Sequence, residues 1–426
     1  MKEDFLHFVW KYKKFNPVNL QTDDGQKLLI TKSGFHNYDG GPDFLDARIM
    51  LDETSWAGNV EIHIKASDWY AHGHHLDKKY NNVILHVVAK NDKVIFREDG
   101  TKVPALNISP LLDLGILRQY KLLQQAKAKI PCHSFLPDID RFIIDQCLDR
   151  MIVERLEDKT KEIQDVLQKE KNDWEYVFLI FLSKYLGGPV NSLPMELLIK
   201  SISYNTFQKK QNSIHHLESL LFGQSGMLNT IESDDDYIKA LKAEYFHYKK
   251  TEDLKPIENK IWQFLRLRPG NFPTIRIAQL CSLYHHSPRL FHTLLMASSP
   301  KVARQILNVS ASEYWNTHYV FNKTSRKKEK KLGKHTANSI LINVVIPFMF
   351  LYGSFRGKES LKDKALSWLE NIPAENNSIT KTWLENGIKA KNALESQALI
   401  ELKKYYCTPK QCLKCNIGIK ILESQS

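Results

Sequence analysis

The sequence predicts an α+β protein, with a small mixed β-sheet layer and flanking helices at the N-terminus and a large, irregular all-α domain after it. Two observations lead to this class. Within residues 1–107, one helical pattern precedes several short segments rich in β-branched and apolar residues. From residue 108 onward, apolar residues recur at three- and four-residue spacing, without a repeating period. We therefore expect one domain at residues 1–107 and a second at residues 108–426.

The elements of the first domain follow from local patterns. Residues 3–14 predict a helix, because their apolar side chains fall on one side. The pair Asn91-Asp92 indicates a hairpin turn between the last two strands. The segment 66–81, rich in His and Tyr, is expected to be irregular or helical. Strands are expected at residues 27–31, 47–51, 59–65, 82–90 and 93–97.

The second domain is predicted to consist of helices separated by proline and glycine. The expected breakers are Gly187-Gly188-Pro189, Pro194, Pro269-Gly270 and Pro273. Helices are expected at residues 118–129, 139–170, 174–186, 195–200, 214–221, 235–248, 274–284, 290–297, 301–307, 339–352, 361–370 and 390–406.

Composition limits the possible partners and compartments. A hydrophobic content of 42% is typical of a globular protein, and a net charge of +12 favours a polyanionic partner such as nucleic acid. The six cysteines are too few for a disulfide framework in 426 residues, which indicates reduced thiols and a cytoplasmic protein. No export signal is visible in the first ten residues. The apolar stretch 339–355 is interrupted by Asn343 and Pro347, so we expect a buried helix and no membrane partner.

Candidate catalytic residues lie between Gly41 and Lys65. Asp43 follows Gly41-Pro42, and in the strand that follows Glu61, His63 and Lys65 alternate with β-branched residues. Because a strand points successive side chains to opposite faces, these three share one face. Carboxylates from Asp43 and Glu61 can hold a divalent metal beside a phosphate, and His63 or Lys65 can orient the attacking water. The alternative is an ordinary solvent-facing strand.

These residues resemble the PD-(D/E)xK nuclease superfamily, which has the restriction-endonuclease-like fold. Pro42-Asp43 corresponds to its PD half and Glu61 to its second acidic position. The resemblance implies that Asp43 and Glu61 are ligands of Mg²⁺ or Mn²⁺ and that the substrate is DNA or RNA. The chain departs from the family at His63, where lysine is usual, and Lys65 lies two residues further on the same face.

Longer segments resemble an uncharacterised bacterial family known only as a domain of unknown function. They lie in both halves of the chain, and the family implies no activity. The segments are GGPDF (40–44), VEIHIKASDWYAHGHHLDKKYNNVILHVV (60–88), RPGNFPTIRIAQL (268–280) and CTPKQCLKC (407–415).

Histidines after the Glu61 strand are a second candidate set. His72 and His74, with His63 and His86, can supply nitrogen ligands, which favour Mn²⁺, Zn²⁺ or Fe²⁺ over Mg²⁺. Their spacing matches no standard zinc motif. The alternative is that the loop histidines fill a turn and that His86 belongs to the core.

The C-terminal cysteines predict a structural metal site. The spacing Cys407-x4-Cys412-x2-Cys415 lets thiolates reach one metal, and Cys132, the histidine after it, or His335 can complete the set. Zinc and an iron–sulfur cluster are both possible. Some CRISPR-associated and recombination nucleases are similar, with one early cysteine and three late ones around a cluster. The alternative is a group of buried free thiols.

Arginines flank the turn at residues 269–273. The guanidinium groups of Arg266, Arg268 and Arg276 can contact phosphates or pair with carboxylates of neighbouring helices, and we expect the pairing.

Three functions fit these observations. The first is a metal-dependent nuclease that hydrolyses phosphodiester bonds in DNA or RNA. The second is a nucleic-acid-binding or scaffold protein that has the same fold without turnover, because His63 occupies the lysine position. The third is a metal-dependent hydrolase of a small phosphoester that uses the histidines.

Overall fold

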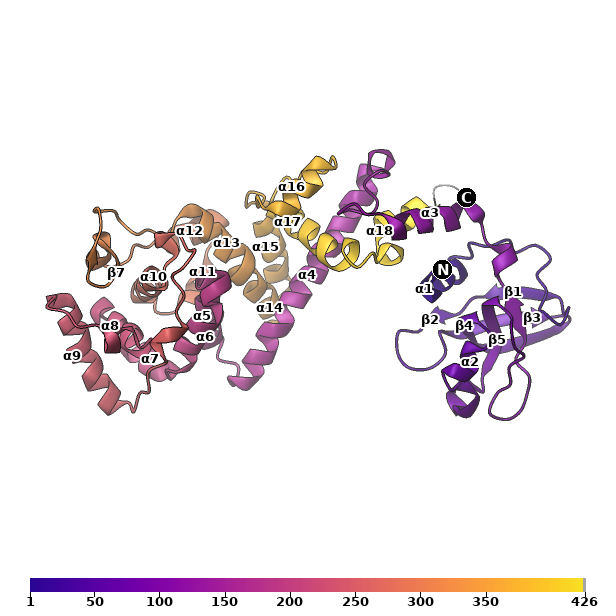
Figure 1. The fold of residues 1–426 in the computed structure, drawn as a ribbon, viewed down its shortest axis with the longest axis horizontal. Coiled ribbons are helices and arrows are strands. Elements are labelled where there is room, and N and C mark those ends of the chain that lie inside the picture. The colour runs from indigo at the N-terminus through magenta and orange to yellow at the C-terminus, as the bar shows by residue number, and fades with distance from the viewer. Residues whose placement is uncertain (424–426) are drawn as a thin grey trace. The chain divides into compact units, whose positions relative to one another are not determined.

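A computed structural model describes residues 1–423, which divide into two compact units (Figure 1). The first unit comprises Met1–Asp149, Lys381–Ile388 and Ile400–Ser426, and the second comprises Arg150–Thr380 and Lys389–Leu399. The expected boundary at residue 107 coincides with the end of the last strand of the large sheet, at Asn107. The first unit extends further, because the C-terminal helix α18 packs against α3 and the turn before α18 contacts α1.

The first unit contains a mixed six-stranded sheet in the order β1-β3-β4-β5-β6, with β2 paired to β3. Neighbours β1, β3 and β4 are antiparallel, whereas β4, β5 and β6 are parallel. The bounds are β1 Leu28–Lys32, β2 Phe35–His36, β3 Phe44–Leu51, β4 Thr54–Lys65, β5 Val83–Lys90 and β6 Ala105–Asn107. This arrangement makes β4 a central strand paired along both edges, and α1 and α2 contact it.

The crossover from β4 to β5 carries the histidine-rich segment. Two parallel neighbours cannot be joined by a tight hairpin, so the chain crosses over through α2 (Asp68–Ala71) and two 3₁₀ turns. Trp69 and Tyr80 anchor this crossover in a buried cluster with Val83 and Val88 of β5. The crossover thereby lies over the strands that carry Glu61, His63 and His86.

The predicted strand at residues 93–97 is absent from the sheet. Asp92 accepts hydrogen bonds from the backbone and hydroxyl groups of Ser67, at 2.9 and 3.0 Å, which hold this segment beside the crossover. Ile95 then enters the buried cluster, and β6 pairs with β5 in parallel instead. The hairpin predicted at Asn91-Asp92 is wrong, because the side chain of Asp92 instead binds Ser67 of the crossover.

Helix α1 (Glu3–Lys11) contacts β4 and buries Phe5, Leu6 and Trp10. It is shorter than predicted, because Lys13 adopts a positive φ of 51°. The same unit includes α3 (Leu114–Gln125), a π-helical segment Leu402–Cys407 and α18 (Asn416–Glu423). The boundary between the units falls within α4 (Arg141–Lys169) and near the ends of α16 (Ser378–Glu385) and α17 (Ala393–Glu401).

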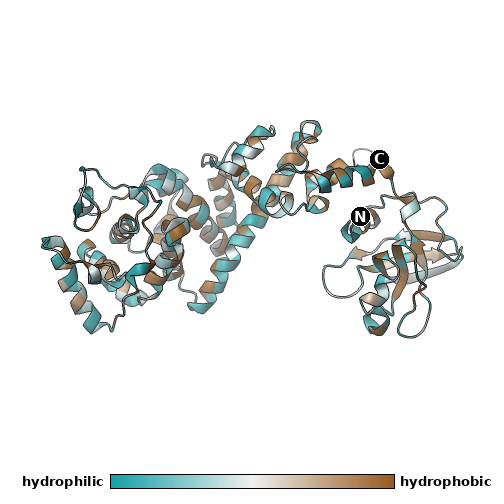
Figure 2. Cartoon of the chain, in the orientation of Figure 1, coloured by the Kyte–Doolittle hydropathy of each residue, from teal (hydrophilic) through white to brown (hydrophobic). Residues whose placement is uncertain are grey.

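The second unit is helical, as expected, apart from a small hairpin of β7 (His318–Val320) and β8 (Lys323–Thr324). Figure 2 shows that many of its helices carry hydrophobic residues along one side and hydrophilic residues along another. Its helices are α5 Trp174–Leu186, α6 Gly188–Lys200, α7 Tyr204–Lys210, α8 Ile214–Gln224, α9 Asp236–Thr251, α10 Pro273–His286, α11 Leu290–Met296, α12 Pro300–Ile306, α13 Lys334–Ile340, α14 Ile346–Arg356 and α15 Glu359–Glu370.

Two prolines lie inside helical segments rather than between them. Pro194 is buried within α6, although we expected it to separate helices. Pro347 follows the π-helical turn Leu341–Val345, which joins α13 to α14. A wider turn relieves the clash between a proline ring and the preceding carbonyl groups. The helical run Lys334–Arg356 is 23 residues long, which is enough to cross a membrane. However, 67% of its most apolar window is buried inside the protein, as is usual for a core helix.

Candidate functional site

Asp43, which directly precedes β3, and Glu61 of β4 lie next to each other where the two strands begin to pair. The backbone N–H of Asp43 donates to Glu61 Oε2 at 3.0 Å, and the N–H of Ile62 donates to Asp43 Oδ2 at 2.9 Å. These bonds fix both side chains relative to the sheet. The approach of the two acids predicted from the sequence is therefore present in the structure.

His7 of α1 joins these carboxylates. Its Nε2 lies 3.2 Å from Asp43 Oδ2 and 4.0 Å from Glu3 Oε1. Burial lowers the pKa of His7, but the hydrogen bond and charge of Asp43 outweigh that effect and raise it above the ordinary value. His7 thus carries a proton beside Asp43 over a wider pH range than a free histidine.

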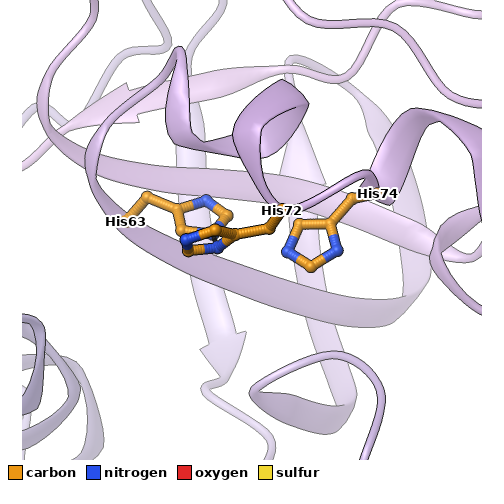
Figure 3. Close-up of side chains that lie close together, drawn as sticks. All are labelled: His63, His72 and His74. Carbon is orange, nitrogen blue, oxygen red and sulfur yellow. Dashed lines mark hydrogen bonds between the residues drawn. The ribbon is translucent and has the colours of Figure 1, made fainter.

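Three imidazole rings surround the other side of Glu61. His63 extends from β4, whereas His72 and His74 come from the crossover, and their rings gather together in Figure 3. One nitrogen of each lies within 4.8 Å of the others. Glu61 Oε1 lies 3.2 Å from His74 Nε2 and 3.6 Å from His63 Nε2. The structure therefore joins the acidic pair and the predicted histidine set into one cluster.

A further layer of side chains orients these rings. His63 Nδ1 lies 2.8 Å from His86 Nε2, and the ring of His74 stacks on Tyr80 with 3.8 Å between centroids. Trp69 packs edge-on against His74. His86 is fully buried, and burial lowers its pKa well below the ordinary value. His86 is a neutral partner that holds His63 from behind, in agreement with the core role considered for it.

The pKa values of Glu61 and His63 are shifted in opposite directions within the cluster. Burial, followed by the nearby charge of Asp43, raises the pKa of Glu61 to about 9. Burial and the neighbouring His74 and His72 lower the pKa of His63 to about 3. Burial thus favours the neutral forms of both Glu61 and His63, and a positive ion placed among these groups would favour the ionised form of Glu61.

Access differs among the predicted residues. Glu61 is 4% exposed and His63 1%, because α1 and the crossover pack against β4; the solvent-facing strand considered as an alternative is thus wrong for both. Asp43 and His72 are accessible, and they mark the open side of the cluster. Lys65 is exposed at the end of β4, two residues beyond His63, and among residues 1–423 it makes no side-chain contact with the cluster.

The comparisons with known proteins place the chain in a family. Residues 3–378 match the family described as "Protein of unknown function (DUF2851)". The chain belongs to this family. The matched range contains Asp43, Glu61 and the histidines, whereas Cys407, Cys412 and Cys415 lie beyond it. Comparisons with curated proteins and with solved structures gave no match.

The four predicted cysteines all belong to the first unit; Cys132 lies within the part matched by the family, and the other three lie beyond it. Cys132 follows α3, Cys407 ends the π-helical segment, and Cys412 and Cys415 border a 3₁₀ turn. All four are less than a tenth exposed. Burial, followed by the nearby Cys415 and Cys412, raises the pKa of Cys132. Of the alternatives to Cys132, His133 is exposed and His335 belongs to the second unit.

Local contacts join the segments that carry these cysteines. Gln124 Nε2 donates to the carbonyl of Lys410 at 3.0 Å, and Lys410 Nζ donates to the carbonyl of Gln124 at 2.6 Å. This pair ties α3 to the turn that follows Cys407. Gly418 allows α18 to approach the carbonyl of Cys412, where an added Cβ would lie only 2.1 Å from the oxygen.

Sequence reasoning missed two histidines near Asp43. His7 lies on α1 between apolar residues, and nothing in that pattern indicated more than an ordinary surface position on the helix. His36 of β2 stacks on Phe44, with 4.8 Å between centroids, and packs edge-on against His7. The signal available for His7 was its i, i+4 spacing from Glu3, which placed an acid and an imidazole on one helix face.

Proposed function

We propose that the protein is a metal-dependent nuclease that hydrolyses phosphodiester bonds in DNA or RNA. The observation that carries the proposal is the cluster in which Glu61 Oε1 lies 3.2 Å from His74 Nε2, while the N–H of Asp43 donates to Glu61 and the N–H of Ile62 donates to Asp43. Carboxylate and imidazole donors within reach of one another, open to solvent on one side, are typical of hydrolytic metal sites.

The order of elements supports a restriction-endonuclease-like fold for the first unit. A helix precedes antiparallel strands, and a crossover then leads to a parallel strand, in the sequence α1, β1, β3, β4, α2, β5. Asp43 precedes β3 and Glu61 lies within β4, as the resemblance to PD-(D/E)xK nucleases implies. This proposal assigns the superfamily's acidic positions to Asp43 and Glu61.

The residues present suit a transition-metal ion better than Mg²⁺. Glu61, His63, His72 and His74 would hold the ion with Asp43 beside it, and neutral imidazoles are the form that binds metal. Mn²⁺ is the best candidate, because it accepts both oxygen and nitrogen ligands and also serves phosphate chemistry. The ion would polarise the phosphate and lower the pKa of a bound water.

The chain's own side chains supply positioning and proton transfer. His7, whose pKa is raised beside Asp43, can hold a proton at Nε2, 3.2 Å from the carboxylate. His63 occupies the position of the superfamily's lysine and is oriented by His86 at 2.8 Å. Lys65, exposed beyond the cluster, can contact a backbone phosphate. The net charge of +12 favours nucleic acid as the partner, and the reduced cysteines favour the cytoplasm.

Two alternative functions predict different experimental results. A hydrolase of a small phosphoester, which the three-histidine cluster also suits, would hydrolyse a phosphomonoester without inhibition by polynucleotide. A nucleic-acid-binding or scaffold protein without turnover would show salt-sensitive binding and no cleavage.

The test is cleavage of labelled single- and double-stranded DNA and RNA with Mg²⁺, Mn²⁺ or Zn²⁺. We expect Mn²⁺-dependent cleavage that falls in Glu61→Gln and in His74→Ala by at least about a hundredfold, the upper end of what loss of a supporting residue costs. Glu53→Gln, a change on the exposed turn between β3 and β4, is the matched control and should retain activity. Absence of cleavage by the wild type under every condition would refute the proposal.

We also propose that Cys132, Cys407, Cys412 and Cys415 hold a structural zinc ion or an iron–sulfur cluster. Their burial together supports this, because four thiols offer a complete ligand set for either group. Elemental analysis with an acid-labile sulfide assay distinguishes zinc from the cluster. Metal should be lost in Cys412→Ser and kept in Cys281→Ala, which alters a buried thiol of α10; equal metal content in both variants would contradict the proposal.

A further inference from the structure

The second unit contains a cavity that the nuclease proposal leaves unused. It has a volume of about 690 Å³, within the range of small-molecule sites. Its wall comes from α5, the α5–α6 junction, the turn before α10, α10 itself and the α13–π-helix run, which lie together in the second unit in Figure 1. Apolar side chains cover part of it, including Phe181, Leu186 and Val344.

Arg276 of α10 is the notable polar group in this wall. The side chain is only 9% exposed. Its Nη1 donates to Gln279 Oε1 at 2.8 Å and its Nη2 to Asn271 Oδ1 at 2.6 Å, so both partners are neutral amides. The expected pairing of this arginine with a carboxylate was wrong.

The charge of Arg276 is therefore not balanced within the described residues. Its Nε is buried and has no hydrogen-bond partner there. Burial lowers the pKa of Arg276, and the phenol of Tyr185 is the group that opposes this effect. A buried guanidinium without an anionic partner is unfavourable, and Arg276 lies in the wall of a cavity that can admit one.

The remaining polar groups of the wall are also suited to an anion. No carboxylate occurs among the described residues that line the cavity. Lys184 lies in the wall but already pairs with Glu162 and Glu196. Gly187 and Gly188 form the wall at the N-terminal end of the 13-residue α6, whose first turn has no side-chain cap.

We propose that this cavity binds a small organic phosphate, with the phosphate on Arg276 and the organic part against the apolar wall. A guanidinium whose fork is already held by two amides is preorganised for an oxyanion. Lining by Phe181 and Leu186 suits a ring or a sugar carried by the same molecule. The site lies wholly within the second unit and is independent of the cluster around Glu61.

Calorimetric titration of the full chain with inorganic phosphate, adenosine monophosphate and adenosine tests the proposal. We expect the monophosphate to bind most tightly, inorganic phosphate more weakly and adenosine least. Arg276→Gln should weaken binding of both phosphates by at least about tenfold, because a charge-assisted hydrogen bond is lost. Arg268→Gln removes an exposed arginine of the same segment, so it should bind as the wild type does.

A second variant keeps the test decisive if Arg276→Gln fails to fold. Ser192→Phe adds bulk at the cavity wall and leaves Arg276 in place, so it should weaken the monophosphate more than inorganic phosphate. No binding of either phosphate by the wild type at millimolar concentrations would overturn the proposal. Equal binding of adenosine and its monophosphate, or unchanged binding in a folded Arg276→Gln, would overturn it as well.

Discussion

Asp43 and Glu61 position each other through the backbone. The N–H of Asp43 donates to Glu61 Oε2 at 3.0 Å, and the residue after Glu61 donates its N–H to Asp43 Oδ2 at 2.9 Å. Burial, followed by repulsion from Asp43, raises the pKa of Glu61 to about 9. Such a pair is costly unless a cation or a proton lies between the acids, which is why we assign it a metal.

Metal affinity should depend on the crossover histidines. His74→Ala removes one nitrogen of the three-imidazole cluster and should weaken Mn²⁺ or Zn²⁺ binding by at least about tenfold. His75→Ala removes the adjacent histidine, whose ring packs on Tyr70 instead, and should leave the affinity unchanged. Titration calorimetry compares the two, and equal affinities would exclude the histidine cluster as the metal site.

Asp43 should also contribute to stability, apart from any chemistry. Asp43→Ala leaves the N–H of Ile62 without its acceptor and should lower the free energy of unfolding by about 1–3 kcal/mol. Asp43→Asn keeps an oxygen at that position and should cost less. Urea denaturation measures both variants. If Asn and Ala destabilise equally, the hydrogen bond to Ile62 is not the reason.

Stability should depend on pH through Glu218 of α8. Burial raises the pKa of Glu218 to about 7, and Tyr237 donates a hydrogen bond to its Oε2 at 2.9 Å. The folded state therefore holds a proton that the unfolded state releases above its ordinary pKa of 4.5, so stability falls as pH rises from 4.5 to about 7. This contribution is about 3 kcal/mol.

Glu218→Gln should remove this pH dependence, because the amide mimics the protonated acid and still accepts from Tyr237. Denaturation at several pH values should show the variant gaining stability relative to the wild type between pH 4.5 and 7. A constant difference across that range would contradict the raised pKa.

Gly223 should be intolerant of a side chain. An added Cβ would lie 2.0 Å from the ring of Tyr245, which packs across α8 from α9. Gly223→Ala should destabilise the second unit by about 1–3 kcal/mol through overpacking, despite the better helix propensity of alanine. Gly270→Ala has open space at the same atom and should be nearly neutral in thermal denaturation. Similar melting temperatures for both variants would refute the packing argument.

Features that depend on local pattern could be predicted from the sequence. The limits of α5 were predicted as Trp174–Leu186, because the apolar period and the flanking Asp173 and Gly187 define both ends. Strand alternation placed Glu61 and His63 on one face, where Glu61 Oε1 lies 3.6 Å from His63 Nε2. Sequence order also indicated the mixed sheet, since residues 66–81 between β4 and β5 are long enough for a crossover.

Features that depend on tertiary contacts could not be predicted. The burial of His63 follows from the crossover that packs against β4, and the lost strand at residues 93–97 follows from the bonds between Asp92 and Ser67. His7 meets Asp43 only because α1 packs on β4. The neutral partners of Arg276 likewise depend on how α10 and the turn before it fold together.

The central claim is that Glu61, His63, His72 and His74 share one cation. The most direct measurement is anomalous X-ray diffraction from crystals of the full chain grown with Mn²⁺. The account predicts an anomalous peak at coordination distance from Glu61 Oε1 and from the imidazole nitrogens, with Asp43 beside it. A structure at saturating Mn²⁺ without a peak among these four residues would contradict it.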